Sequence, residues 1–134
     1  MPKYEKKPEV DTRELSEDTV FTLLSARRRR EMLRILMQLG GETTVADLVV
    51  EVANREHGRE SNAAKRKAIY VSLHQTHIPK FAEAGVLEHD VANQTIRLTG
   101  HWKQLYAYLE FDPLKTKQGL LSRIFRPQTG RTAD

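Results

Sequence analysis

The spacing of apolar residues changes near residue 86 of this 134-residue chain. Before that point, apolar residues recur every three or four positions, which is the period of a helix with one buried face. The segments Val86–Asp90 and Thr95–Leu98 instead have the two-residue period of strands, with a turn containing Asn93 between them. Helical spacing returns from Trp102 to Leu109. These periods predict a mainly α domain with one small β-hairpin.

Capping residues and glycine mark the helix boundaries in the first forty residues. Ser16, followed by two acidic residues, is the expected N-cap of a first helix in which Phe21 and Leu24 face inward, with Leu23 as a further candidate. Ser25 is the expected cap of a second helix, which Gly40-Gly41 should end. The apolar stripe of that second helix consists of Met32, Leu33, Ile35, Leu36 and Leu39. A short extended segment is expected at residues 42–45.

A helix-turn-helix is expected in the middle of the chain. Thr44 should cap a helix over Val45–Asn54, and residues 57–62 have the length and composition of a turn. A basic helix should then run from residue 63 to about residue 77. Because Pro79 cannot donate a backbone hydrogen bond, this helix should kink or end there, and a short helix should restart.

Composition divides the chain into three parts. Residues 1–15 are an expected flexible N-terminal arm, residues 16–111 form the domain, and residues 112–134 form a flexible basic C-terminal tail. An amphipathic segment of the tail, Leu120–Arg126, could lie on an anionic membrane surface, which is a weaker alternative. The sequence has no bilayer-spanning stretch, no secretory signal and no cysteine. These features predict a cytoplasmic protein. We do not expect it to bind a membrane.

The order of the expected elements is that of a winged helix-turn-helix, in which a hairpin wing follows the helix-turn-helix. Lys80–Leu87 looks like the end of the third helix in many bacterial and archaeal winged-helix regulators. Leu24–Leu33 and Tyr70–Lys80 resemble a haloarchaeal winged helix-turn-helix family of largely uncharacterised proteins, over about residues 16–110. Members of that family are described only as candidate DNA-binding regulators. The resemblance therefore implies the fold more strongly than the function.

Charge is distributed unevenly along the chain, which has 22 basic and 18 acidic residues. Residues 65–80 hold four basic residues and no acidic one, whereas residues 81–111 hold four acidic and two basic residues. A solvated helix face would explain the basic cluster about as well as a polyanion partner. Haloarchaeal proteins are commonly strongly acidic, so a net positive chain departs from that group. We interpret this departure as the mark of a nucleic-acid partner.

In a winged helix, the basic helix is expected to enter the major groove of double-stranded DNA. Its candidate contacts carry positive charge or hydrogen-bonding groups, and they are Lys65, Arg66, Lys67, Tyr70, Ser72 and Gln75. Arg27 and Arg28 are candidate phosphate contacts, because cations in the first turn oppose the helix dipole and need another explanation. The hairpin offers Asn93, Gln94 and Arg97, although its tip carries no basic residue.

The orientation of the basic helix stays open at this point. Two apolar sets on nearly opposite faces fit a buried side equally well. The first set is Ile69, Leu73 and His77, and the second is Ala64, Ala68, Val71 and Ile78. An exposed Tyr70 and Val71 could dock another, regulatory protein. The alternative function is therefore a winged-helix protein–protein interaction module without sequence-specific DNA binding.

The last helix carries a broad apolar face. Its members, at helical spacing, are Trp102, Leu105, Tyr106 and Leu109. This face could form the interface of a homodimer, and burial within one chain is an equal alternative.

Catalytic and metal-binding patterns are weak in this sequence. His74 and His77 lie one helical turn apart, but no third ligand stands near them, so core or surface histidines fit better than a metal site. The sequence has no nucleophile elbow, phosphate-binding loop or paired acids. We therefore expect no enzymatic activity, no metal and no cofactor.

Overall fold

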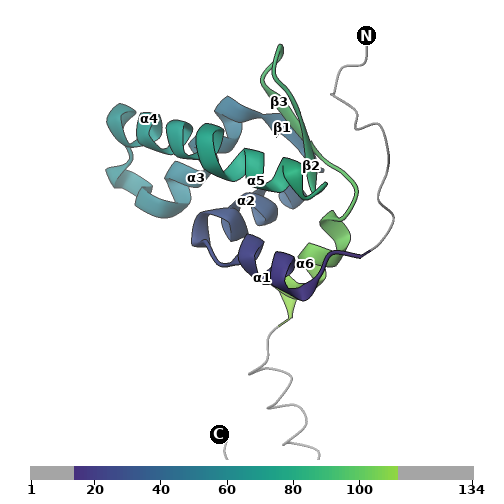
Figure 1. The fold of residues 1–134 in the computed structure, drawn as a ribbon. Helices are drawn as coiled ribbons and strands as arrows, with labels where there is room; N and C mark the ends of the chain where they lie inside the picture. The colour runs from purple at the N-terminus through teal and green to yellow at the C-terminus, as the bar shows by residue number, and fades with distance from the viewer. Residues whose placement is uncertain (1–13, 112–134) are drawn as a thin grey trace, which may run out of the picture.

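The computed structural model describes residues 14–111, which form six α-helices and a small three-stranded sheet (Figure 1). In chain order the elements are α1 (Glu17–Leu24), α2 (Arg27–Gln38), β1 (Glu42–Thr44), α3 (Val45–His57), a 3-10 turn (Gly58–Glu60), α4 (Ala63–Ser72), a π-helical turn (Leu73–His77), α5 (Ile78–Glu83), β2 (Leu87–Asp90), β3 (Thr95–Leu98) and α6 (Trp102–Glu110). Most of the predicted arm, and the whole predicted tail with Leu120–Arg126, lie outside the described residues. None of the helices within residues 14–111 is long and apolar enough to cross a membrane.

Side-chain caps begin three of the helices, and the sequence predicts two of these caps, Ser16 and Thr44. The side-chain oxygens of Ser16, Thr44 and Asn62 each accept a hydrogen bond from the backbone N–H three residues on, at 2.9–3.1 Å. The prediction for Ser25 is wrong. Its hydroxyl donates to the Thr22 carbonyl at the end of α1 (2.7 Å), and α2 begins after Ala26 without a side-chain cap.

The sheet has three antiparallel strands in the order β1-β3-β2. The predicted hairpin is present as β2 and β3, and the class, mainly helical with a small sheet, is confirmed. The sheet is larger than the predicted hairpin. The expected extended segment at 42–45 contains β1, which pairs with β3 as a third strand. Thr43 faces Ile96 in that pairing, so β3 becomes the central strand.

Buried side chains from every helix form one core beneath the sheet. The α2 stripe is buried at Met32, Leu33, Ile35 and Leu36, but Leu39 is 44% exposed. In α1 the inward residues are Val20 and Leu23, and the prediction for Phe21 is wrong, since this side chain is 57% exposed. Leu24 is partly buried and packs against the core.

The π turn decides which face of α4 is buried. Ile69 and Leu73 are buried one α-turn apart, and Ile78, five residues further on, is buried on the same side. A π turn closes with a bond between residues five apart, and here the Ile78 N–H donates to the Leu73 carbonyl. The extra residue brings Ile78 onto the face of Ile69 and Leu73, whereas a continuous α-helix would place it on nearly the opposite face.

The helices and strands form two ends of the domain (Figure 1). α3 packs along α4, and the β2–β3 hairpin rises beside α5 and the end of α4. α1 and α6 pack together at the opposite end of the domain.

A close backbone approach makes Gly100 more sensitive to substitution than the other glycines within residues 14–111. Gly100 has φ +63°, and an added Cβ would lie 2.2 Å from the Gly85 carbonyl oxygen. We expect Gly100→Ala to lower the free energy of unfolding by about 3 kcal/mol or more, because the backbone must move. Gly40→Ala is the matched control. Its φ is +87° with nothing within 4 Å of an added Cβ, so it should cost only the left-handed strain, about 1–2 kcal/mol. Urea denaturation of both variants measures the difference, and equal losses would contradict the role of this contact.

Candidate nucleic-acid interface

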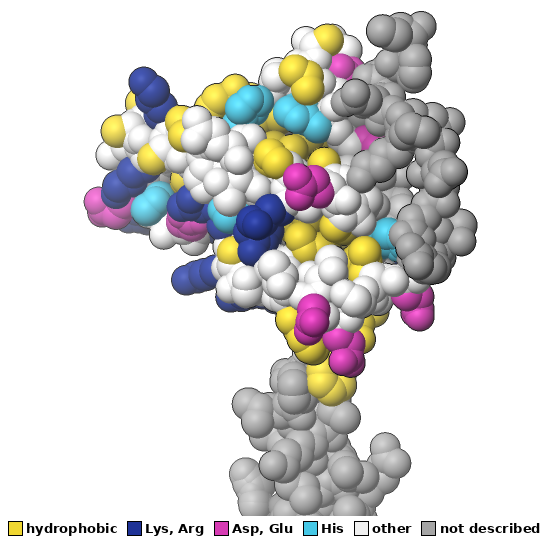
Figure 2. Space-filling view, viewed as in Figure 1, with side chains coloured by type: hydrophobic (Ala, Val, Ile, Leu, Met, Phe, Trp, Pro, Cys, Tyr) yellow, Lys and Arg dark blue, Asp and Glu magenta, His cyan; other side chains and the backbone are white. Residues whose placement is uncertain are grey.

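One exposed stripe runs along the outer side of α4 and into the π turn. Its residues follow helical spacing at positions 64, 67, 68, 71 and 75, and all five are exposed. They are Ala64, Lys67, Ala68, Val71 and Gln75, and we call them the α4 stripe. Figure 2 shows most of the visible Lys and Arg side chains over the α3–α4 half of the molecule, with acidic side chains among them, and further acidic side chains over α1.

The three basic residues at the start of α4 have different surroundings. Lys67 is exposed on the α4 stripe. Lys65 is partly buried, and its ammonium donates to the Glu60 carbonyl (3.0 Å), which ties the helix start to the preceding turn. Arg66 lies three residues before buried Ile69 and is partly buried on that inward side. Of the three, Lys67 is therefore the best placed to meet a ligand in front of the helix.

The polar and aromatic candidates on this helix are also spread around it. Gln75 belongs to the α4 stripe, and Ser72 is partly buried beside it. Tyr70 is 39% exposed and stacks on His74, with ring centroids 5.5 Å apart. His74 in turn meets the edge of His89 on β2, with centroids 5.8 Å apart. This ring stack joins the π turn to the hairpin. Its third member, His89, was not among the residues predicted from the sequence.

The arginine run at the start of α2 binds the protein itself. Arg28 donates two hydrogen bonds to the Glu56 carboxylate, both 2.6 Å long. This contact lowers the pKa of Glu56 and raises that of Arg28. Arg30 donates to the Leu24 carbonyl (2.6 Å). Arg28 is therefore held by Glu56 in this structure, whereas Arg27 is exposed, and the phosphate contacts of both residues stay predictions.

Arg29 is buried where α1, α2 and the π turn meet. Its side chain donates to the Leu23 and Thr22 carbonyls at the end of α1 (2.7 and 2.8 Å). It also lies 3.0 Å from Nδ1 of His77. Burial and the nearby arginines lower the pKa of His77 to about 4, so the ring is neutral at pH 7 and Nδ1 accepts from the guanidinium.

The two histidines considered as a metal pair point to different partners. His77 faces Arg29, while His74 lies between Tyr70 and His89. No three histidine, cysteine or acidic residues within residues 14–111 are grouped so that they could hold a metal ion.

The hairpin side chains mostly stabilise the hairpin. Asn93 donates from its backbone and its side chain to the Asp90 carboxylate (3.2 and 2.8 Å). Gln94 has φ +53° and donates to the Val91 carbonyl (2.9 Å). Arg97 pairs with Glu88 on the neighbouring strand. The turn contacts of Asn93 and Gln94 are those that turn chemistry alone would require.

The apolar face of α6 is largely used within one chain. Leu105 is fully buried, and Trp102 and Leu109 pack against the core. As an interface between subunits, the predicted set of Trp102, Leu105, Tyr106 and Leu109 is therefore wrong at Leu105. The exposed aromatic side chains at this end are Phe21, Tyr108 and Phe111, and the rings of Phe21 and Tyr108 meet edge to face at 6.0 Å.

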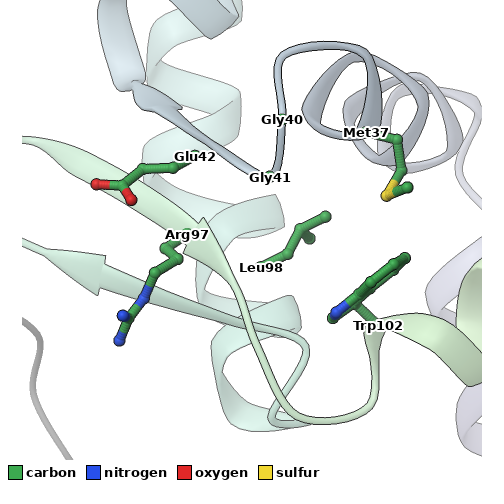
Figure 3. Close-up of a pocket in the computed structure, with 7 residues that line it drawn as sticks. All are labelled: Met37, Gly40, Gly41, Glu42, Arg97, Leu98 and Trp102. Atoms are coloured by element: carbon green, nitrogen blue, oxygen red, sulfur yellow. The ribbon is translucent and has the colours of Figure 1, made fainter.

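A shallow hollow of about 360 Å³ lies between the end of α2, the sheet and α6 (Figure 3). Met37, Leu98 and Trp102 point toward one another on its apolar side, whereas Glu42 and Arg97 point away from them. The lining holds no pairing of a nucleophile with a base.

Comparison with known proteins yields one match. A protein-family model described as a domain of unknown function (DUF7344) matches residues 21–97. No curated protein and no solved structure matches the chain. The matched range begins within α1 and ends within β3, so it includes α4 and the hairpin but not α6.

The low pKa of His77 predicts a loss of stability in mild acid. The unfolded ring takes up a proton near pH 6.5, but the folded ring does so only near pH 4. The unfolded state therefore binds more protons between these values, and stability falls as the pH drops through this window. Each pKa unit is worth about 1.4 kcal/mol, and because the ring is partly exposed we expect a loss of about 1–2 kcal/mol.

His77→Asn tests this expectation, because the Asn side-chain oxygen can accept from Arg29 but does not titrate. Urea denaturation at pH 7 and near pH 4 should show a smaller loss of stability in the variant. Part of the dependence should remain, since burial also lowers the pKa of His89. His101→Asn, just before α6, is the control and should keep the native dependence. An unchanged dependence in His77→Asn would rule out the assignment.

Proposed function

The chain belongs to the DUF7344 family, and we propose that it is a DNA-binding transcription regulator with a winged helix-turn-helix fold. In this proposal α3 and α4 form the helix-turn-helix, α4 lies in the major groove, and the β2–β3 hairpin is the wing. The regulator acts in the cytoplasm, without enzymatic activity, metal or cofactor. The sequence resemblance to haloarchaeal winged-helix proteins supports the same assignment.

The α4 stripe is the observation that carries the proposal. It is exposed along a helix that stands clear of the core on one side, and residues 61–82 contain no acidic residue. A helix that enters a groove lined with phosphates needs an outer face free of negative charge. The neighbouring hairpin, fixed to the π turn by the stack of Tyr70, His74 and His89, would lie along the flanking backbone.

The proposed DNA contacts differ in exposure and in their position around α4. Lys67 and Gln75 lie in front of the helix and would meet the groove directly. Lys65, Tyr70 and Ser72 lie on its sides and would meet phosphates at the rims, whereas Arg66 lies on the inward side and would be the weakest contact of the set. Arg27 would add a phosphate contact from α2. Asn93, Gln94 and Arg97 already stabilise the hairpin, so wing contacts would be weak.

A charge reversal on the α4 stripe tests DNA binding. We expect Lys67→Glu to lower affinity for duplex DNA about tenfold and to reduce the slope of log K against log salt by about 1. Lys103→Glu is the matched control, since Lys103 is exposed on α6 at the other end of the domain. Fluorescence anisotropy over a salt series measures both. If the chain bound no duplex above background near 0.1 M salt, or if both variants bound equally, the proposal would fail.

Protein docking is a second candidate, because Tyr70 and Val71 are each 39% exposed beside this stripe. In that case α4 would bind another regulatory protein through apolar contacts. Binding of such a partner should survive Lys67→Glu, since the charge is not its main contact.

We also propose that the regulator is a homodimer, joined through the end of the domain that holds α1 and α6. Phe21 and Phe111 are 57% and 58% exposed there, and aromatic side chains of this size are enriched at protein interfaces. Phe21→Ser should shift the chain toward monomer in sedimentation equilibrium, because the substitution removes a central apolar contact. Val91→Ser, at the exposed hairpin tip, should not. A native chain that sediments as a monomer at the concentrations used for DNA binding would contradict the dimer.

A further inference from the structure

The chemistry of the α4 stripe is unusual for a groove-reading surface, because most of it is methyl groups. Ala64, Ala68 and Val71 carry no polar side-chain atom, and all three are exposed. Lys67 is the one charged member of the stripe, and Gln75 extends it into the π turn. Arg66 lies toward the core side, so no arginine stands on the stripe.

These residue types match one kind of base pair. In the major groove thymine presents its C5-methyl group, on which small apolar side chains pack. Adenine presents N7 and the N6 amino group, which a glutamine side chain can bond with both ends of its amide. Guanine is read mainly by arginine or lysine, and only Lys67 is available for that on the stripe.

The size of the side chains adds a steric reason. Ala64 and Ala68 are one helical turn apart, and their side chains are short. The backbone of α4 can therefore approach the base edges closely along the first part of the stripe. Val71 and Gln75 follow at the same spacing and reach further. Gln75 lies next to His74, whose ring is held between Tyr70 and His89, so the turn that carries Gln75 is fixed relative to the hairpin.

We propose that α4 selects A·T-rich DNA, with Ala64, Ala68 and Val71 packing on thymine methyl groups and Gln75 bonding adenine. This inference rests on the proposed function, since it specifies which duplexes the same helix prefers. The flanking cations, among them Lys65 and Lys80, supply affinity that does not depend on sequence. The methyl stripe and Gln75 supply the preference.

The first experiment identifies the preferred duplex. The full chain selects bound duplexes from a random pool at fixed salt, and the recovered half-site should be rich in A·T pairs. Each thymine of that site is then replaced in turn by uracil, which lacks only the methyl group. Removing one packed methyl group should weaken binding about three- to fivefold.

A double-mutant cycle then assigns a methyl group to Val71. In Val71→Ala, the uracil effect should disappear at one thymine and persist at the others, because the partner of that methyl group has been shortened. Val50→Ala is the matched control, since Val50 is 43% exposed on α3 and lies away from the stripe. That variant should show the native uracil effect at every position. Gln75→Ala should likewise become insensitive to 7-deazaadenine at one adenine. Circular dichroism melting confirms that the three variants remain folded.

The possible outcomes separate the two proposals. A pool rich in G·C pairs, or binding that no uracil substitution weakens, would overturn the A·T preference and leave DNA binding in place. Uracil effects that Val71→Ala and Val50→Ala change equally would overturn the assignment of the stripe. Recovery of no duplex at all would overturn the proposed function itself.

Discussion

The buried guanidinium of Arg29 is the contact on which the arrangement of α1, α2 and the π turn depends. The last carbonyl groups of a helix have no donors within the helix. Arg29 donates to two of them, at Thr22 and Leu23, and so holds the end of α1 against α2. Another partner, His77, belongs to the π turn, and the low pKa of this histidine follows from its burial and from the neighbouring Arg29 cation. The position of the turn that ends α4 is therefore set by a residue 48 positions earlier in the chain.

Periodicity predicted most of the helices and the hairpin, because one buried face imposes its spacing on the sequence. It could not orient α4, since Ile78 is five residues after Leu73 and shares its face only because a π turn lies between them. Pro79 was the available signal: it has no N–H to donate, so a break in the α-helical pattern near it was predictable, but its form was not. The pairing of β1 with β3 joins residues more than fifty positions apart and leaves no mark in local spacing.

The candidate site was harder to predict than the fold, for a physical reason that the arginine run makes plain. Four consecutive arginines suggest binding to a polyanion, but the sequence does not show which group each arginine contacts in the folded chain. Glu56, which binds Arg28, lies 28 residues away, and the carbonyls that bind Arg29 and Arg30 belong to backbone that any sequence has. Lys67 and Gln75 were predicted because their residue types suit a groove. The methyl groups that separate them acquired meaning only when the orientation of α4 was known.

The same packing also determines what each end of the domain can bind. Leu105 is buried in the core, so α6 turns Tyr108 outward against Phe21, and exposed Phe111 follows this helix. α1 and α6 lie at the end of the domain away from α4 (Figure 1). A second copy bound at that end would leave the α4 stripe of each copy uncovered. Two such stripes related by a two-fold axis would face two half-sites of one duplex. The weakly charged stripe and the aromatic end are thus compatible features of the proposed regulator, because each surface stays exposed while the other is occupied.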